Sequence, residues 1–260
     1  MRSRRIAGAL LSGTLVLIPA LGWSQGTACV NASFVPADGR INGAVSITGG
    51  VSGSTYYFQV PTTVANSYSF EVVDAVDPLG ASSGSLSLAL FSDAGCTTSL
   101  SVTNTKGTAP GVGLVNARAS WTATTVTTLV SLSVPATMNL NVTWTANDTT
   151  LYSPSWSTNG AYDTFYSFKN TTATSITGTL TLFNAGGTQV TQTPLTIPAA
   201  ATAATNTAAL GTVRNTAGTA TFVHNGPPGA ILAEANIANF TLTPTPYNQV
   251  VKFQSVREIR

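Results

Sequence analysis

Apolar and polar residues alternate along most of the chain, which is the pattern of β-strands with one buried face. Tyr56, Phe58 and Val60 alternate with polar residues before Pro61. The same alternation returns in 68–72, 86–90, 130–134, 138–144, 176–182 and 250–256. Gly, Pro, Asn or Ser residues bound each run, so we expect strands of about five to eight residues joined by turns.

The strand runs fall into two groups separated by the polar stretch 146–154, ANDTTLYSP. Each side of that stretch is long enough to enclose its own core. We therefore predict an all-β protein with two tandem antiparallel β-sandwiches of jelly-roll or immunoglobulin-like type, at residues 25–148 and 149–260. The Ala-rich segment 198–210 is rich in threonine and lacks long side chains, so we expect it to be extended rather than helical.

The composition explains how such sheets meet water with few charges. Only 8% of the residues are charged, whereas hydrophobic residues make up 43%. Most of the polar surface is expected to come from threonine, serine, asparagine and glycine. Threonine is β-branched and therefore suits a β-sheet with one solvent-exposed face. The hydrophobic fraction and its alternation exclude a disordered chain.

The first 24 residues have the organisation of a signal peptide. Arg2, Arg4 and Arg5 precede an apolar run at 6–21, and Gly22 and Ser24 provide a small-x-small cleavage pattern. We favour the general secretory route over twin-arginine export, because most of the twin-arginine consensus is missing. The mature chain has no other apolar stretch that could cross a bilayer, so we expect an exported protein of the periplasm or extracellular space.

Removal of this leader changes the charge of the chain. Three of the 11 basic residues belong to the leader, so eight remain against nine acidic residues, a net charge of about −1 instead of +2. No basic patch of the kind that nucleic-acid binding needs is visible. We expect no nucleic-acid partner.

The chain contains two cysteines, Cys29 and Cys96, both in the first half. In an exported protein such a pair usually forms one disulfide. The bridge would close a loop of roughly 67 residues and stabilise the fold by about 4 kcal/mol on the chain-entropy model. Lipid attachment at Cys29 is the competing interpretation, but the sequence before it departs from a lipobox, and Cys96 would be left alone.

The first half resembles a known domain family. The segments STYYFQVP, SYSFEVVDA, SLSLALFSDAGCTTSL and ASWTATTVTTLVSLSVPATMNLNVTW, between Tyr56 and Trp144, are similar to the bacterial pre-peptidase C-terminal domain family. That resemblance implies a jelly-roll-like β-sandwich, which occurs attached to secreted enzymes or alone in surface proteins. Ser54-Thr55 stands where the family usually has an aspartate-tryptophan pair.

The second half, from about Leu151 to Lys252, looks like a C-terminal module of exported bacterial proteins of unknown function. The resemblance rests on SPSWSTNGAYDTFYSFKN, SITGTLTLFNAGG, NTAALG and HNGPPGAILAEA. It implies an immunoglobulin-like or related sandwich and implies no activity.

His224 is the only histidine, and Glu234 follows it ten residues later. A hydrolase that used His224 would need a serine and a carboxylate in the same cleft, and the chain has no G-x-S-x-G motif. The turn sequence Asn225–Gly229, NGPPG, follows His224 directly and precedes another alternating run. We therefore interpret His224 as the last residue of a strand at a hairpin and expect no catalytic residue.

A metal site is a weaker candidate. One histidine and two paired cysteines exclude an ordinary zinc site, whereas Asp74 and Asp77 in VVDAVDPLG could contribute oxygen ligands to calcium. Asx-turns are the simpler explanation of such aspartates, so we expect neither a metal nor a cofactor.

The densest aromatic cluster lies between Trp156 and Phe168 and also contains Tyr162, Phe165 and Tyr166. Aromatic residues fall on both strand faces here, although one face of an antiparallel sheet usually meets water. We therefore expect an exposed ring, at Tyr166 or Trp156, on a surface that binds a sugar or a protein.

These observations favour a non-catalytic, exported binding or scaffolding module. Its expected partners are a glycan or a cell-surface protein, recognised through Trp156, Tyr162, Tyr166 and His224, or a second copy of the chain, because charges that guard sheet edges are scarce. The alternatives are a secreted hydrolase or its accessory domain, and a structural subunit of a pilus or matrix.

Overall fold

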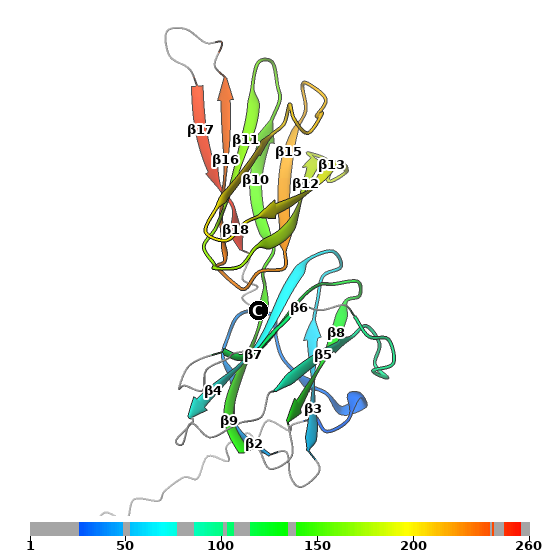
Figure 1. The fold of residues 1–260 in the computed structure, drawn as a ribbon. Coiled ribbons are helices and arrows are strands. Elements are labelled where there is room, and N and C mark those ends of the chain that lie inside the picture. The colour runs from blue at the N-terminus through cyan, green and yellow to red at the C-terminus, as the bar shows by residue number, and fades with distance from the viewer. Residues whose placement is uncertain are drawn as a thin grey trace, which may run out of the picture.

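The computed structural model describes residues 26–48, 53–76, 86–100, 103–106, 115–134, 139–239, 241 and 247–255. Their secondary structure is almost entirely β, with one short 3-10 helix, η1 (Cys29–Asn31). The prediction of an all-β fold is confirmed (Figure 1). The predicted leader, residues 1–24, lies outside the described part.

Among the described residues, nine strands precede residue 149 and form two sheets, with the orders β1-β3-β8-β5 and β2-β9-β4-β7-β6. All pairs are antiparallel except β1 with β3. The strands are β1 (Ser33–Phe34), β2 (Asn42–Thr48), β3 (Ser54–Pro61), β4 (Ser67–Val76), β5 (Ser87–Phe91), β6 (Thr103–Lys106), β7 (Val115–Thr122), β8 (Thr127–Val134) and β9 (Asn139–Asp148). We call this group the N-terminal half.

The other nine strands that the structure describes form two further sheets, with the orders β13-β12-β15-β10-β18 and β14-β11-β16-β17. We call this group the C-terminal half. Its strands are β10 (Leu151–Ser157), β11 (Asp163–Asn170), β12 (Ile176–Asn184), β13 (Gln189–Ile197), β14 (Thr202–Asn206), β15 (Ala217–His224), β16 (Ile231–Asn239), β17 (Tyr247–Lys252) and β18 (Gln254–Ser255).

Each half encloses a hydrophobic cluster of its own. Phe58 from β3 packs on Phe70 from β4 and Trp144 from β9, so both sheets of the N-terminal half contribute to one core. In the C-terminal half, Phe168 from β11 packs on Phe222 from β15, across its two sheets. Two sheets around one core form a sandwich, whereas the division into independent domains at residues 25–148 and 149–260 stays a prediction.

The disulfide between Cys29 and Cys96 is present, as the sequence predicts. It joins η1 to the turn after β5, and in that turn Asp93 accepts hydrogen bonds from the backbone N–H groups of Gly95, Thr97 and Thr98. These donors lower the pKa of Asp93 to about 2. Asp93 therefore organises a turn instead of offering a free carboxylate.

The connection between the halves consists of Thr149 and Thr150, both buried. The N–H of Thr149 donates to the carbonyl of Ser67, and the N–H of Ser67 donates to the hydroxyl of Thr150 at 2.9 Å. The Thr149 hydroxyl donates to that of Ser67 at 3.0 Å. A two-residue connection with these bonds is held rigidly against β4, and it positions the candidate site described next.

Candidate functional site

The unique histidine does not lie at a hairpin. His224 ends β15, but β15 and β16 belong to different sheets, so NGPPG is a crossing between the sheets. The hairpin interpretation is therefore wrong. Crossing from one sheet to the other carries the chain over the end of the core, and His224 is only 4% exposed.

The His224 ring is hydrogen-bonded to backbone groups. Its Nδ1 accepts a hydrogen bond from the N–H of Gly226 at 3.1 Å, and the ring is hydrogen-bonded to the backbone of Thr149. Burial lowers the pKa of His224 to about 4, and backbone hydrogen bonding offsets only part of this effect. The ring is therefore neutral at pH 7 and joins the C-terminal half to the connection.

The geometry of His224 gives no support to the hydrolase alternative. His224, Asp148 and Ser255 do line one crevice of about 560 Å³ between the halves. Within the part of the chain that the structure describes, however, neither Asp148 nor Ser255 is hydrogen-bonded to the ring, whose Nδ1 already accepts from the backbone. A general base needs a nitrogen that can accept the nucleophile's proton.

The predicted aromatic surface is mostly core. Trp156 and Tyr166 are each 1% exposed, so the expectation that one of them presents an open ring is wrong. The Trp156 indole N–H donates to the carbonyls of Phe183 and Thr219 at 2.9 and 3.0 Å. Tyr166 points inward from β11, where burial raises the pKa of its hydroxyl well above the ordinary value.

Two other rings of the cluster reach the surface. Tyr162 is half-buried and packs edge-on against Tyr247 with ring centroids 5.4 Å apart. Phe165, on the outer face of β11, is 37% exposed. Strand parity explains the difference between Phe165 and Tyr166, because even-numbered positions of β11 face the core and odd-numbered positions face outward.

The calcium candidates cannot be evaluated as a pair. Asp74 lies in β4, but the structure does not describe its side chain. Asp77 lies outside the described residues. Among the side chains that the structure describes, no three His, Cys, Asp or Glu groups gather as a metal site.

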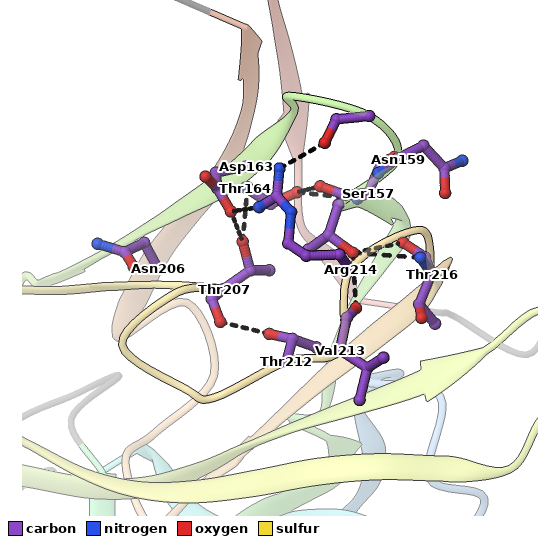
Figure 2. A network of polar contacts seen from close by, with 12 residues as sticks. Ser157, Asn159, Asp163, Thr164, Asn206, Thr207, Thr212, Val213, Arg214 and Thr216 are labelled. Atoms are coloured by element: carbon purple, nitrogen blue, oxygen red, sulfur yellow. Dashed lines mark hydrogen bonds and ion pairs between the residues drawn. The ribbon is translucent and has the colours of Figure 1, made fainter.

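A polar network closes the end of the C-terminal half around Asp163 and Arg214 (Figure 2). Arg214 contacts Asp163 at 2.7 Å and donates to the carbonyl of Gly160 at 2.7 Å. The same Asp163 oxygen accepts from the hydroxyl of Thr207, which in turn accepts from the N–H of Thr164. Because the charges are satisfied within the network, we assign it the role of fixing the loop after β14.

The strongest candidate site is a pocket of about 550 Å³ on the N-terminal half beside the connection, which we call the junction pocket. Residues from several distant parts of the chain line it: Phe34, Pro36, Ala37, Asp38, Arg40, Pro61, Thr62, Thr63, Asn66, Tyr68, Asp148 and Tyr152. Ala37 and Asp38 form part of one wall, held in place because Asp38 pairs with Asn147 at the end of β9.

Polar groups of the junction pocket are held in place before any ligand arrives. The Asn66 amide donates to Asp148 Oδ2 at 2.9 Å and to the hydroxyl oxygen of Tyr152 at 2.7 Å. The N–H of Thr150 donates to Asp148 Oδ1 at 2.9 Å. The carboxylate and the phenol therefore have fixed orientations, set by Asn66 and, for the carboxylate, also by Thr150 of the connection.

The two tyrosines of the pocket remain hydrogen-bond donors at neutral pH. Burial, together with the nearby Asp148 charge, raises the pKa of Tyr152, and burial is also the main cause of the raised pKa of Tyr68. The hydroxyl oxygen of Tyr68 accepts from the N–H of Thr63 at 2.7 Å. Since both oxygens accept bonds from the protein, their hydrogens can be donated to a ligand.

The rim of the pocket combines an exposed ring with an ion pair. Phe34 is 57% exposed although it is a large apolar side chain. Arg40 Nε lies 3.1 Å from Asp38 Oδ2. Sequence reasoning missed these residues, because nothing in the local pattern brings Phe34, Asn66 and Tyr152 together.

The fold and this pocket define the class of the protein: an all-β protein of antiparallel sheets with a ligand-sized pocket beside the connection of its halves. No protein family matches the chain, and no curated protein has a significantly similar sequence. The resemblance of the first half to the pre-peptidase C-terminal domains thus stays a prediction. Within the described residues, no helix is long and apolar enough to cross a membrane.

Proposed function

We propose that the chain is an exported, non-catalytic binding protein of the cell envelope or extracellular space, with the junction pocket as its binding site. The predicted leader and the disulfide support export, because disulfides persist in oxidising compartments. The observation that carries the proposal is the prearranged set of Asn66, Asp148 and Tyr152 next to the exposed ring of Phe34. An exposed aromatic ring beside converging polar groups is typical of a binding site.

The chemistry of the pocket favours a glycan as ligand. Tyr68 and Tyr152 offer hydroxyl donors, Asp38 and Asp148 offer carboxylate acceptors, and Arg40 offers a guanidinium at the rim. A saccharide carries adjacent hydroxyls that both donate and accept, together with an apolar ring face that packs on an aromatic side chain. The Asp38–Arg40 pair and the single further carboxylate leave the lining with a net charge of only −1, which suits a neutral ligand.

The test is binding of the exported protein to an array of defined glycans and to cell-envelope fractions of the host, followed by titration of whatever is retained. We expect Phe34→Ala to weaken binding by roughly tenfold or more, since an aromatic contact in a binding site contributes about 1–3 kcal/mol. Tyr152→Phe removes one hydroxyl without changing the ring and should weaken binding by a similar factor.

Val213→Ala is the matched control, because Val213 is also an exposed apolar residue and lies in the C-terminal half, away from the pocket. The control should bind like the unmodified protein. Retention of no glycan and no envelope component would overturn the proposal. Equal binding by the Phe34 variant and the control would overturn the assignment of the site.

A further inference from the structure

The outermost strand of the sheet β14-β11-β16-β17 is β17, and Figure 1 shows it at the side of the C-terminal half. One edge of β17 pairs with β16, and no described strand pairs with its other edge. An edge strand presents unpaired backbone N–H and C=O groups that can pair with another chain, so natural proteins usually guard such edges.

Several other edges of the described sheets are guarded or covered. Pro194 stands in the middle of β13 and removes a backbone donor from that edge. The segment 98–100 covers β5 through the hydrogen bond from Leu100 N–H to the carbonyl of Leu90 and the bridge between Phe91 and Ser99. β14 has only small side chains, and β1 and β18 contain two residues each.

The edge of β17 lacks these guards. Its sequence, YNQVVK, contains neither proline nor glycine, and its pairing with β16 runs from Tyr247 to Lys252 without a bulge. Lys252 is its only charged residue and stands opposite Glu234 of β16, so the neighbouring strand already offsets that charge.

Apolar side chains accompany this edge on the outer face of the sheet. Val250 is 55% exposed and belongs to one cross-strand row with Asn236 and Phe165. Tyr247, at the start of the strand, is also exposed. Pairing of another strand along β17 would cover Val250 and extend this row.

We infer that β17 is a self-association edge that pairs antiparallel with β17 of a second copy of this chain. A two-fold axis gives both copies the same environment, so one strand can be its own partner. When the axis passes through Val250, Lys252 meets Asn248 of the second copy; when it passes between Gln249 and Val250, Lys252 meets Tyr247. Neither register opposes two lysines, so the charge pattern of the strand is compatible with itself.

The contact is small, so we expect a weak dimer with a dissociation constant on the order of 100 μM, in the range of transient interfaces. The experiment is sedimentation equilibrium of the exported protein from about 10 μM to 1 mM, with hydrogen exchange at the two ends of that range. We expect the average mass to rise with concentration and the amides of β17 to gain protection.

Two lysine substitutions distinguish association through the edge of β17 from association through the face of the sheet. Val250→Lys puts positive charges at the edge of both copies and should weaken the dimer by roughly tenfold or more. Leu232→Lys is the matched control: Leu232 is 63% exposed on the neighbouring strand β16, so the charge change is the same but lies off the edge. The control should dimerise like the unmodified protein.

A strictly monomeric protein at 1 mM would overturn the inference. Equal weakening by the two variants would overturn it as well, because it would indicate contact through the sheet face instead of the edge. The result does not depend on glycan binding, since β17 contributes no residue to the junction pocket.

Discussion

The imidazole of His224, at the end of β15, is hydrogen-bonded to the backbone of Thr149 in the connection between the two halves. Residues 75 positions apart in the sequence thus meet where the halves join. The histidine that the sequence marks as a possible catalytic residue makes a structural contact instead. Its protonation state therefore bears on the stability of this region.

We predict that the protein loses stability on acidification because of His224. Its pKa is about 4 in the folded protein, below the ordinary 6.5, so folding favours the neutral ring. The contribution is fully present above pH 6.5 and is lost as the pH falls from 6.5 towards 4. The loss should reach about 2–3 kcal/mol at pH 4.5.

Urea unfolding at pH 7.5 and pH 4.5 measures this loss, and His224→Asn provides the comparison. The amide oxygen can still accept from the N–H of Gly226, but the side chain does not titrate. The variant should therefore show a smaller fall in unfolding free energy between the two pH values. An identical fall in both proteins would show that other groups cause the acid sensitivity.

A second prediction concerns the rigidity of the connection. Thr150→Val keeps the shape of the side chain but leaves the buried N–H of Ser67 without its acceptor. We expect a loss of about 1–3 kcal/mol in the free energy of unfolding, the cost of an unpaired buried donor. Thr150→Ser retains the hydroxyl and should lose less than about 1 kcal/mol. Equal losses, measured by urea unfolding, would mean that packing and not the hydrogen bond is responsible.

The sequence predicts features that depend on local pattern. The alternation at 176–182 corresponds to β12, and the Ala-rich segment contains β14, as expected. The cysteine pair and the all-β class follow from composition and spacing. The last predicted strand, 250–256, is instead divided by Phe253 into β17 and β18, which belong to different sheets.

The candidate site depends on relationships that local pattern does not contain. Phe34, Asn66 and Tyr152 meet in the junction pocket because β1, the turn before β4 and the start of β10 converge beside the connection. Alternation shows that Tyr166 shares a face with Phe168, but it does not show which face is inside. The strand topology decides which residues meet in the pocket and which face of β11 is buried. That topology depends on pairing between strands that are far apart in the sequence.

A third prediction tests the close approach of β12 and β15. A Cβ atom on Gly218 would lie 1.9 Å from the carbonyl oxygen of Phe183, the group that accepts the indole N–H of Trp156. Gly218→Ala should therefore cost about 3 kcal/mol or more in unfolding free energy, since backbone atoms must move.

Gly186→Ala is the control, in the turn between β12 and β13 of the same sheet. A Cβ atom there would meet only Asn184 Oδ1, at 3.4 Å, so the change should stay within about 1 kcal/mol. Thermal unfolding followed by tryptophan fluorescence reports on both variants, because Trp156 is buried next to Gly218. A stable Gly218 variant with unchanged fluorescence would contradict the close approach.

The last prediction uses Asn170, whose side chain is fully buried at the end of β11. Its amide nitrogen donates to the carbonyls of Thr174, Ile197 and Pro198 at 2.7, 3.0 and 3.1 Å. Asn170→Asp replaces this donor with an acceptor that faces three carbonyl oxygens. We expect a loss of about 3 kcal/mol or more at pH 7, because one oxygen of the buried carboxylate would face three carbonyl oxygens, while only the other would still accept from the N–H and hydroxyl of Thr172.

The pH dependence of this loss has a defined sign. Burial and the carbonyls raise the pKa of the new carboxyl group above its unfolded value of about 3.9, so the loss relative to the unmodified protein is small below pH 4 and grows as the pH rises. Asn184→Asp is the matched control, since the Asn184 oxygen accepts from the N–H groups of Gly186 and Thr188 and a carboxylate preserves both bonds. Urea midpoints at pH 4 and pH 7 should diverge for the first variant and not for the second; a flat difference for Asn170→Asp would contradict the donor role of its amide.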